Sequence, residues 1–357
     1  MTIPMARIAS QCLSARSAHP GLTLDKGLRE WDSDATKRGN RFGALVAGVA
    51  SIDAPEIYAS FYNRWLDMIC RCENFAVWAG QLDGRLYIGN SGANPIEVSI
   101  SMHKTYGVPL IAGSAIKGVT RAFALRNDVS GEVCDVIFGK EPKRGDASED
   151  TSSAGHLIFH DAWWIPNDRS KPYAQEVITV HHPNYYKEKG KVDATDLDSP
   201  NPNVQVAARG SFLFLIEGQK TWANWAMTLL VEALKTEGIG AKTFSGYGYF
   251  VDHERINADI DKRREAIALE RLPVKQRIKK EVEKLGIDGI EKLLGKGWDS
   301  SKEKSEYELN GQLEIFIDIV KEKYGEDIVK WKDLTGKPSK HRRRVYRMLY
   351  GDVGSDQ

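Results

Sequence analysis

The sequence has few cysteines, little net charge and no long apolar run, and each shortage excludes a class of protein. Four cysteines among 357 residues, with no pair of C-x-x-C units, argue against a structural zinc site. A chain of this length can bury a core without disulfides, so free thiols in a reducing compartment are expected. No stretch approaches the ~18 apolar residues of a membrane-spanning helix, and the N-terminus has no signal-peptide core. We expect a cytoplasmic protein without metal or cofactor.

The charge balance constrains the kind of ligand surface that the chain can carry. The formal net charge is +1, with 41% hydrophobic and 28% charged residues, which is typical of a folded domain. A free-standing nucleic-acid-binding domain is often strongly basic. Any cationic surface must therefore be local, with acidic surface elsewhere, as in a subunit that has a polyanion on one side and protein neighbours on another.

Residues 75–251 alternate between strand-like and helix-like patterns. Two segments with periodic apolar residues favour helices, and the segments between them are rich in alternating or continuous apolar residues typical of strands. The order is strand, helix, strand, strand, helix, strand, which predicts an α+β, ferredoxin-like (RRM-like) core with large loop insertions. The predicted elements are strands at 75–82 and 85–89 around an Asp83-Gly84 turn, a half-buried strand at 97–102, a helix from 114, strands at 155–165 and 211–217, a helix at 222–236 and a strand near 251.

The segments around this core are predicted more coarsely. Residues 1–40 are polar and are predicted to be loop, with Pro20-Gly21 and Arg38-Gly39-Asn40 as turn signals. Residues 55–72 predict a helix, with Pro55 in its first turn. Its apolar residues at helical spacing are Ile57, Phe61, Trp65, Met68 and Ile69.

Two polar insertions, 139–154 and 187–203, are predicted to be loops. Beyond about residue 255 the chain is rich in Lys, Glu, Arg and Leu at helical spacing. The predicted organisation is an N-terminal segment with one helix (1–74), a core (75–254) and a mostly helical C-terminal extension (255–357).

The first glycine motif has the chemistry of a phosphate site. Gly113 and Ser114 are predicted to open a helix, with Ser114 as N-cap, and a helix N-terminus offers N–H groups and a positive dipole end to anions. Lys117 and Arg121 lie four residues apart and share a face. The motif is no P-loop, because no GKS or GKT occurs. An ordinary capped helix with exposed cations is the alternative.

A second glycine-rich loop spans residues 238–248. Its glycines allow close approach of the backbone to a ligand, and Tyr247 could stack on a base. A dinucleotide-binding loop is disfavoured, because such a loop follows a strand and opens a helix, whereas this one follows a helix. A flexible connector remains an alternative. The candidate ligand residues are Gly240, Lys242, Thr243, Gly246 and Tyr247.

Histidines and a basic run supply weaker candidates. His181 and His182 sit in a polar-aromatic cluster whose spacing matches no common metal motif, so structural, RNA-contacting and catalytic roles stay open. His103 is expected near the first glycine motif. The last predicted helix carries Lys340, Arg342, Arg343, Arg344 and Arg347; it is either a solvated face or a contact for phosphates or an acidic neighbour.

Together these motifs resemble the RAMP superfamily of CRISPR proteins. GVPLIAGSAIKGVTR is similar to the superfamily's Pro-x-x-x-Gly-Ser-Ser-x-Lys-Gly-x-x-Arg segment, and GIGAKTFSGYGYF is similar to its glycine-rich loop. HPGLTLDK, DVIFGKEP, AGHLIFHDAWW and HHPNYY narrow the resemblance to the sixth subunits of Cmr, the type III-B effector complexes. One departure is Ala115, where the superfamily has a second serine.

The resemblance implies a non-catalytic subunit that holds the 3′ part of the CRISPR RNA near one end of a backbone filament. Its implied partners are CRISPR RNA, target RNA paired to it, backbone subunit four, small helical subunit five and RAMP subunit one. Cleavage is implied to lie in the backbone subunit. An alternative is a RAMP endoribonuclease that uses His181 or His182. The expected RNA-binding residues are Gly113, Ser114, Lys117, Arg121, Gly240, Lys242, Thr243, Gly246, Tyr247, His181, His182 and His103.

Overall fold

The computed structural model describes residues 18–28, 32–89, 98–140, 152–166, 171–180, 182–198, 200–295, 307–308, 310–332, 334–335 and 340–351. Its contacts divide the chain into two compact units, Met1–Asp261 and Lys262–Gln357. The boundary falls within helix α9 (Glu254–Glu270). The three-part organisation expected from the sequence stays a prediction. Among the described residues, no helix combines the length and the hydropathy needed to cross a membrane.

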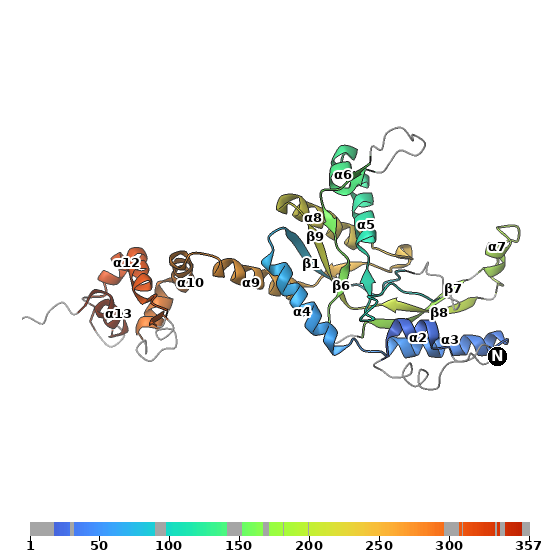
Figure 1. Ribbon diagram of the computed structural model, residues 1–357, viewed down its shortest axis with the longest axis horizontal. Helices are drawn as coiled ribbons and strands as arrows, with labels where there is room; N and C mark the ends of the chain where they lie inside the picture. Colours follow the sequence, from blue (N-terminus) through green and yellow to red (C-terminus); the bar gives the residue numbers. More distant parts are fainter. Residues whose placement is uncertain are drawn as a thin grey trace, which may run out of the picture. The chain divides into compact units, whose positions relative to one another are not determined.

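The first unit is built on a twisted antiparallel sheet, which confirms the α+β class (Figure 1). Strand β9 (Ser211–Glu217) is a continuous apolar run, six of whose residues are buried, as expected of a strand covered on both faces. It pairs with β1 (Phe75–Leu82), with Trp78 opposite Phe214. The sheet order is β10-β1-β9-β6-β2, with β5 also pairing with β9. The other strands are β2 (Leu110–Ile111), β5 (Ile158–Phe159), β6 (Ala162–Trp164) and β10 (Phe250–Asp252).

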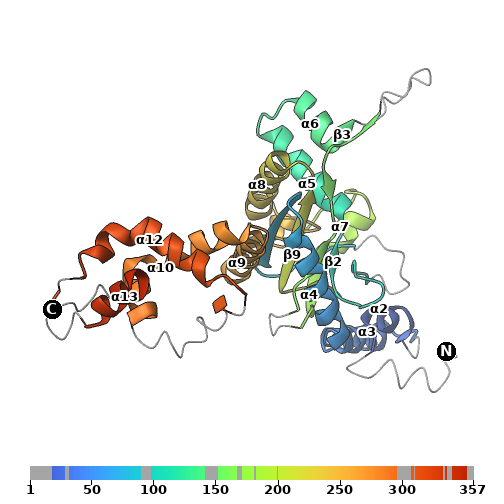
Figure 2. The same ribbon diagram turned by 60° about the vertical axis from the view of Figure 1, so that its left-hand side comes forward.

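Two helices pack together beside this sheet. The predicted helices α5 (Gly113–Arg126) and α8 (Lys220–Thr236) are confirmed, and both views show them side by side (Figures 1 and 2). Helix α8 contacts β1 and β9 through a buried apolar stripe that includes Met227, Leu230 and Leu234. The predicted strand at 155–165 is two short strands, β5 and β6, separated at His160 and Asp161.

The predicted helix at 55–72 is confirmed as α4 (Glu56–Arg71), but of the apolar residues expected on its inner face only Ile69 is buried. Ile57 is 66% exposed. The Tyr58 hydroxyl donates to the Trp164 carbonyl oxygen on β6, and its ring packs against the aromatic residues of that strand. The buried face carries the rings of Tyr58 and Tyr62, because a tyrosine buries a large ring and can still place its hydroxyl on a polar partner, as Tyr58 does. The buried residues are Tyr58, Tyr62, Leu66, Ile69 and Cys70.

The prediction that residues 1–40 are loop is wrong for the part that the structure describes. Helices α2 (Pro20–Lys26) and α3 (Ala35–Ala50) occupy much of it. Pro20 is the first residue of α2. A proline is tolerated there because the backbone N–H that it lacks would have no partner within the helix. His19 accepts a hydrogen bond from the Leu22 N–H, and Asp34 caps α3 by accepting from the Lys37 N–H. These caps were present in the sequence as helix-start signals.

The predicted strand at 75–82 is confirmed as β1, but its predicted pairing with a second strand at 85–89 is wrong. Strands β9 and β10 pair with the two edges of β1. Residues 85–89 therefore cannot pair with β1. Leu86 and Tyr87 instead form single bridges to Ala208 and Ala241. The predicted strand at 97–102, described from Val98 onward, shows alternating burial but only one bridge, Met102 to Pro109.

A long hairpin that the sequence did not reveal extends from the sheet. Strand β7 (Tyr173–Val180) pairs with β8 (Asn201–Ala208), α3 packs against both strands, and α7 (Pro183–Lys187) lies near the far end of the hairpin (Figure 1). The predicted loop 187–203 therefore ends in strand. The predicted loop 139–154 begins and ends in the paired strands β3 (Gly139–Lys140) and β4 (Ser153–Ala154), and its residues 141–151 lie outside the described residues.

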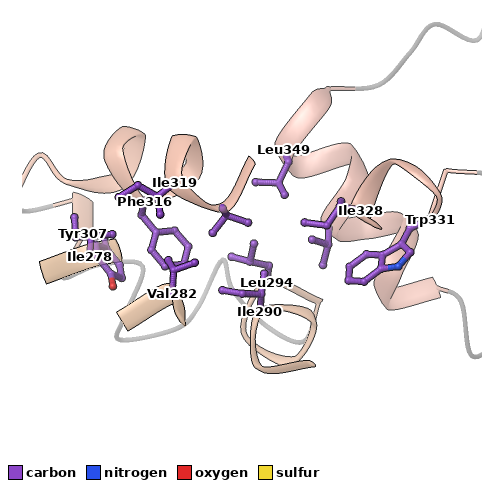
Figure 3. Packing of buried hydrophobic residues seen from close by; sticks show 12 residues of the cluster. Ile278, Val282, Ile290, Leu294, Tyr307, Phe316, Ile319, Ile328, Trp331 and Leu349 are labelled. Atoms are coloured by element: carbon purple, nitrogen blue, oxygen red, sulfur yellow. The ribbon is translucent and has the colours of Figure 1, made fainter. Parts of the chain in front are cut away.

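The second unit is helical, as predicted. Helices α10 (Val274–Gly295), α12 (Leu313–Val329) and α13 (Lys340–Tyr350) enclose an apolar core, drawn in Figure 3. Phe316 is fully buried and its ring lies 4.8 Å from that of Tyr307. The buried residues are Ile278, Val282, Ile290, Leu294, Tyr307, Phe316, Ile319, Val320, Ile328, Trp331, Val345 and Leu349.

One ion pair ties β10 to α8 and predicts a pH effect. Asp252 accepts from Lys235 Nζ at 2.7 Å and from Trp78 Nε1 at 2.8 Å, and these donors, Lys235 first, lower the pKa of Asp252 below its ordinary value of 3.8. The lowered pKa means that the pair stabilises the fold above that value and stops doing so as pH falls through the folded-state pKa. We expect Asp252→Asn to lower the free energy of unfolding near neutral pH by about 1 kcal/mol at most.

The difference between wild type and Asp252→Asn should shrink on acidification, measured by urea denaturation across pH. The control is Glu232→Gln, an exposed carboxylate on α8. A difference that stays constant from neutral to acidic pH would show that the pair does not act through the charge of Asp252.

Candidate nucleic-acid interface

A cleft of about 470 Å³ lies along the side of α5, facing the ends of β3 and β4. It contains three cationic side chains, two from α5 and one, Lys140, from β3. A helix face and a neighbouring hairpin thereby concentrate positive charge on one surface, although the whole chain is almost neutral. The lining residues are Ser114, Lys117, Gly118, Arg121, Ala122, Leu125, Phe138, Gly139, Lys140 and Ser153.

The cations of this cleft keep capacity for an anionic ligand. Arg121 has one carboxylate near it, with its Nη2 at 3.9 Å from Asp135 Oδ1 on α6 (Gly131–Phe138), which is at the outer limit of an ion pair. Its Nε is buried without a hydrogen-bond partner, a costly state that an added acceptor would relieve. Within the residues that the structure describes, no ion pair involves Lys117. The predicted sharing of a face by Lys117 and Arg121 is confirmed.

The start of α5 differs from the prediction. Ala112, not Ser114, is the N-cap, so the prediction of a serine cap is wrong by two residues. The Gly113 N–H donates to Asp161 Oδ1 at 2.7 Å, and this carboxylate already lies at the positive end of the helix. Ser114 is exposed in the first turn and lines the cleft. An anion is therefore better accommodated along the side of α5 than at its end.

The glycine-rich loop is an ordered turn rather than a flexible connector. Gly240 and Gly248 have φ values of +93° and +80°, and a Cβ at either position would lie 2.2 Å or less from a backbone oxygen. The loop is held by hydrogen bonds from the Ala241 N–H to the Tyr87 oxygen and from the Gly248 N–H to the Arg85 oxygen, both 2.8 Å. Only glycine fits these two positions.

The outer part of this loop presents groups suited to a phosphate and a base. Lys242 is exposed and left-handed (φ 62°), and a 3-10 turn, Thr243–Ser245, follows it. In the described structure, the backbone N–H groups of Lys242, Thr243 and Phe244 make no hydrogen bond. Successive N–H groups in a left-handed to right-handed turn form a concave anion site. The Phe244 side chain is fully exposed and offers a ring face.

The inner part of the loop is tied to the sheet and to the hairpin. The rings of Tyr247 and Tyr87 lie 4.7 Å apart, and burial raises the pKa of the Tyr87 phenol. Arg85 pairs with Glu176 on β7 at 3.2 Å. Tyr247 is therefore a half-buried packing residue rather than a free stacking surface, and the loop joins the base of the β7–β8 hairpin.

The histidines lie in two places. His103 packs against Tyr106 and Trp163. Burial lowers the pKa of His103, and the charge of the nearby Asp161 carboxylate opposes this shift. Because Asp161 also accepts from the Gly113 N–H, His103 lies near the start of α5, as expected. His182 hydrogen-bonds Asp198 through Nδ1 at 2.9 Å, next to α7 and well away from α5 in Figure 1. His181 lies outside the described residues.

The structure therefore gathers most of the predicted residues into two groups. Ser114, Lys117 and Arg121 line the α5 cleft, and the residues of the glycine loop form the other group. Gly113 and His103 lie near the start of α5 without lining the cleft, and His182 lies next to α7.

Sequence reasoning missed Lys140, which joins the cleft only through the β3–β4 pairing, and Phe244, an apolar residue inside a polar glycine loop that could have been noticed. Among the described residues, no set of three His, Cys, Asp or Glu side chains is placed to hold a metal ion.

A family of known proteins matches the segment that carries these groups. The family model of the RAMP superfamily matches residues 81–251, a segment that contains both the α5 cleft residues and the glycine loop. The resemblance to RAMP proteins predicted from the sequence is thereby confirmed.

A particular relative supports the narrower resemblance. The chain is 27% identical over 257 residues to the CRISPR system Cmr subunit Cmr6 of Pyrococcus furiosus, covering 56% of this chain and 74% of that protein. Similar solved structures include a chain of a type III-B Cmr-beta complex bound to cognate target RNA (19% identity, TM-score 0.47, covering 63% and 77% of the two chains). Another is the crystal structure of Cmr6 from Pyrococcus furiosus (24% identity, TM-score 0.31, covering 50% and 98%).

Proposed function

We propose that this chain is a Cmr6-like, non-catalytic subunit of a type III-B Cmr complex that binds the 3′ part of the CRISPR RNA. The observation that carries the proposal is the concentration of phosphate-binding groups in the RAMP-matching segment. Lys117, Arg121 and Lys140 line one cleft, and unpaired N–H groups at 242–244 lie beside an exposed lysine. Such groups contact phosphates with little base specificity.

The fold supports a ferredoxin-like core beneath these groups. Taken along the chain, β1, α5, β6, β9, α8 and β10 follow the β-α-β-β-α-β order, and all their strand pairs are antiparallel. Sheet cores of this type bind single-stranded RNA in RRM proteins. The cleft is lined mainly by α5, and the loop follows α8, so both of these core helices contribute to the candidate interface.

We assign the partners by the same reasoning. The guide would reach target RNA by base pairing, and the neighbours would be other Cmr subunits, among them subunits one, four and five, in the cytoplasm. Cleavage is assigned to another subunit. The comparisons give no support to the nuclease alternative, and the His182–Asp198 pair lies away from both groups of RNA-binding candidates.

Charge reversal in the two groups tests the proposal. We expect Lys117→Glu and Lys242→Glu each to weaken binding of the full-length chain to a fluorescently labelled CRISPR RNA. Each lost contact should reduce the slope of log affinity against log salt by ~0.7, measured by fluorescence anisotropy. Lys220→Glu, at the exposed start of α8, is the matched control and should behave like wild type. Unchanged slopes in both test variants would refute the assignment of these groups.

A further inference from the structure

The last helix of the second unit divides its basic residues between two faces. Two of them anchor α13 to its own unit. His341 Nδ1 lies 2.9 Å from the Gly295 carbonyl oxygen, and Arg342 donates to Glu291 at 2.8 Å while lying over the Trp331 ring. Val345 and Leu349 on the same helix are buried in the unit's core. The orientation of α13 within this unit is therefore fixed.

The remaining cations form a row on the outer face. Lys340, Arg344 and Arg347 are exposed, and Arg343 is half-buried between them. Steps of three and four residues place these side chains one above another along the helix. Like charges at this spacing repel one another and lower the stability of a helix.

The charge of this helix is also segregated from that of its neighbour. Helix α13 has five Lys or Arg residues and no acidic residue, whereas α12 has five acidic and two basic residues. A row made mainly of arginine suits phosphate, because the planar guanidinium donates two parallel hydrogen bonds to an anionic group. An ordinary solvated face would mix both signs, as the N-terminal half of α10 does with Lys275, Lys279 and Glu281.

We infer that the outer face of α13 is a second RNA-binding surface that contacts the sugar-phosphate backbone of a single strand. It lies outside residues 81–251, the segment that matches the RAMP superfamily. The recognition is electrostatic and independent of sequence, since the row presents cations in a line along the helix. This surface adds to the proposed guide site and does not depend on which part of the guide that site holds.

The test compares neutralised pairs in the full-length chain. Arg344→Gln/Arg347→Gln removes two charges of the row, and Lys275→Gln/Lys279→Gln removes two exposed charges of α10 in the same unit. The probe is a fluorescein-labelled single-stranded RNA of mixed sequence. Two lost contacts lower the log–log slope by ~1.4, so the loss of affinity between about 50 and 200 mM salt should be about sevenfold smaller for the α13 pair. The α10 pair should retain the wild-type slope.

Two further variants keep the outcomes distinct. Lys340→Gln/Arg343→Gln removes the other half of the row and should show the same reduction in slope. Circular dichroism reports whether either pair of substitutions perturbs folding. Lys242→Glu, assayed in parallel, tests the proposed guide site separately. Unchanged slopes in both α13 pairs, or equal reductions in the α10 pair, would overturn the inference. Loss of a protein neighbour from the purified complex with RNA binding unchanged would also overturn it, in favour of an acidic protein partner.

Discussion

Gly113→Ala is expected to lower the free energy of unfolding of the first unit by about 3 kcal/mol, the upper range for overpacking a buried site. A Cβ at this position would lie 2.1 Å from the Phe159 carbonyl oxygen. Phe159 belongs to β5, which pairs with the central strand β9, so the oxygen cannot move without disturbing the sheet. The methyl group must therefore push the start of α5 away and strain the hydrogen bond from the Gly113 N–H to Asp161.

Gly118→Ala in the same helix provides the matched control with the opposite sign. Nothing lies within 4 Å of a Cβ placed at Gly118, and alanine is preferred over glycine in a helix interior by ~1 kcal/mol. We expect that much stabilisation, measured with Gly113→Ala by chemical denaturation followed by far-UV circular dichroism. Equal effects of the two substitutions would mean that helix propensity, and not contact with β5, governs position 113.

Phe316→Ala should destabilise the second unit by about 3–5 kcal/mol, the usual range for deleting a buried aromatic ring. Phe316 is fully buried in the core of Figure 3 and packs on Tyr307. A loss of this size is a large fraction of the stability of a domain, so the helices α10, α12 and α13 should lose protection together. Hydrogen exchange with mass spectrometry reads this loss peptide by peptide.

Phe244→Ala is the matched control for this substitution. The Phe244 side chain is fully exposed in the glycine loop, so its removal should change stability by less than about 0.5 kcal/mol. Unaltered protection of residues 278–294 in Phe316→Ala would contradict the role of Phe316 as the centre of this core.

The sequence predicted those elements whose local pattern agrees with their tertiary environment. Strand β9 is a continuous apolar run and is buried, and α8 has a regular apolar stripe and packs on the sheet. The hairpin predicted at 75–89 does not form, although Asp83-Gly84 is a good turn signal. A turn signal gives no information on which strands compete for the edge of β1, and the strand that pairs there, β10, lies 170 residues further along the chain. The buried face of α4 was predicted only in part, because Tyr58 and Tyr62 are buried beside Leu66 and Ile69 and had not been counted among the apolar residues.

The candidate site was predictable where it depends on helical spacing and not where it depends on distant pairing. Lys117 and Arg121 share a face because they are four residues apart, and any helix at this position would place them so. Lys140 reaches the same cleft because α6 returns the chain beside α5 and β3 then pairs with β4, and Asp161 reaches Gly113 across 48 positions. Neither contact can be predicted from the residues next to it in the sequence.

The left-handed backbone of Lys242 has a consequence for how the loop meets a ligand. A residue with a Cβ adopts this conformation at a cost of about 1 kcal/mol or more, and glycine would adopt it with less strain. The Tyr87 and Arg85 carbonyl oxygens hold the flanking residues at 2.8 Å and fix the corner before any ligand arrives. The entropy of ordering the lysine backbone and its N–H groups is thus lost during folding rather than during binding, which favours tight association with a flexible strand.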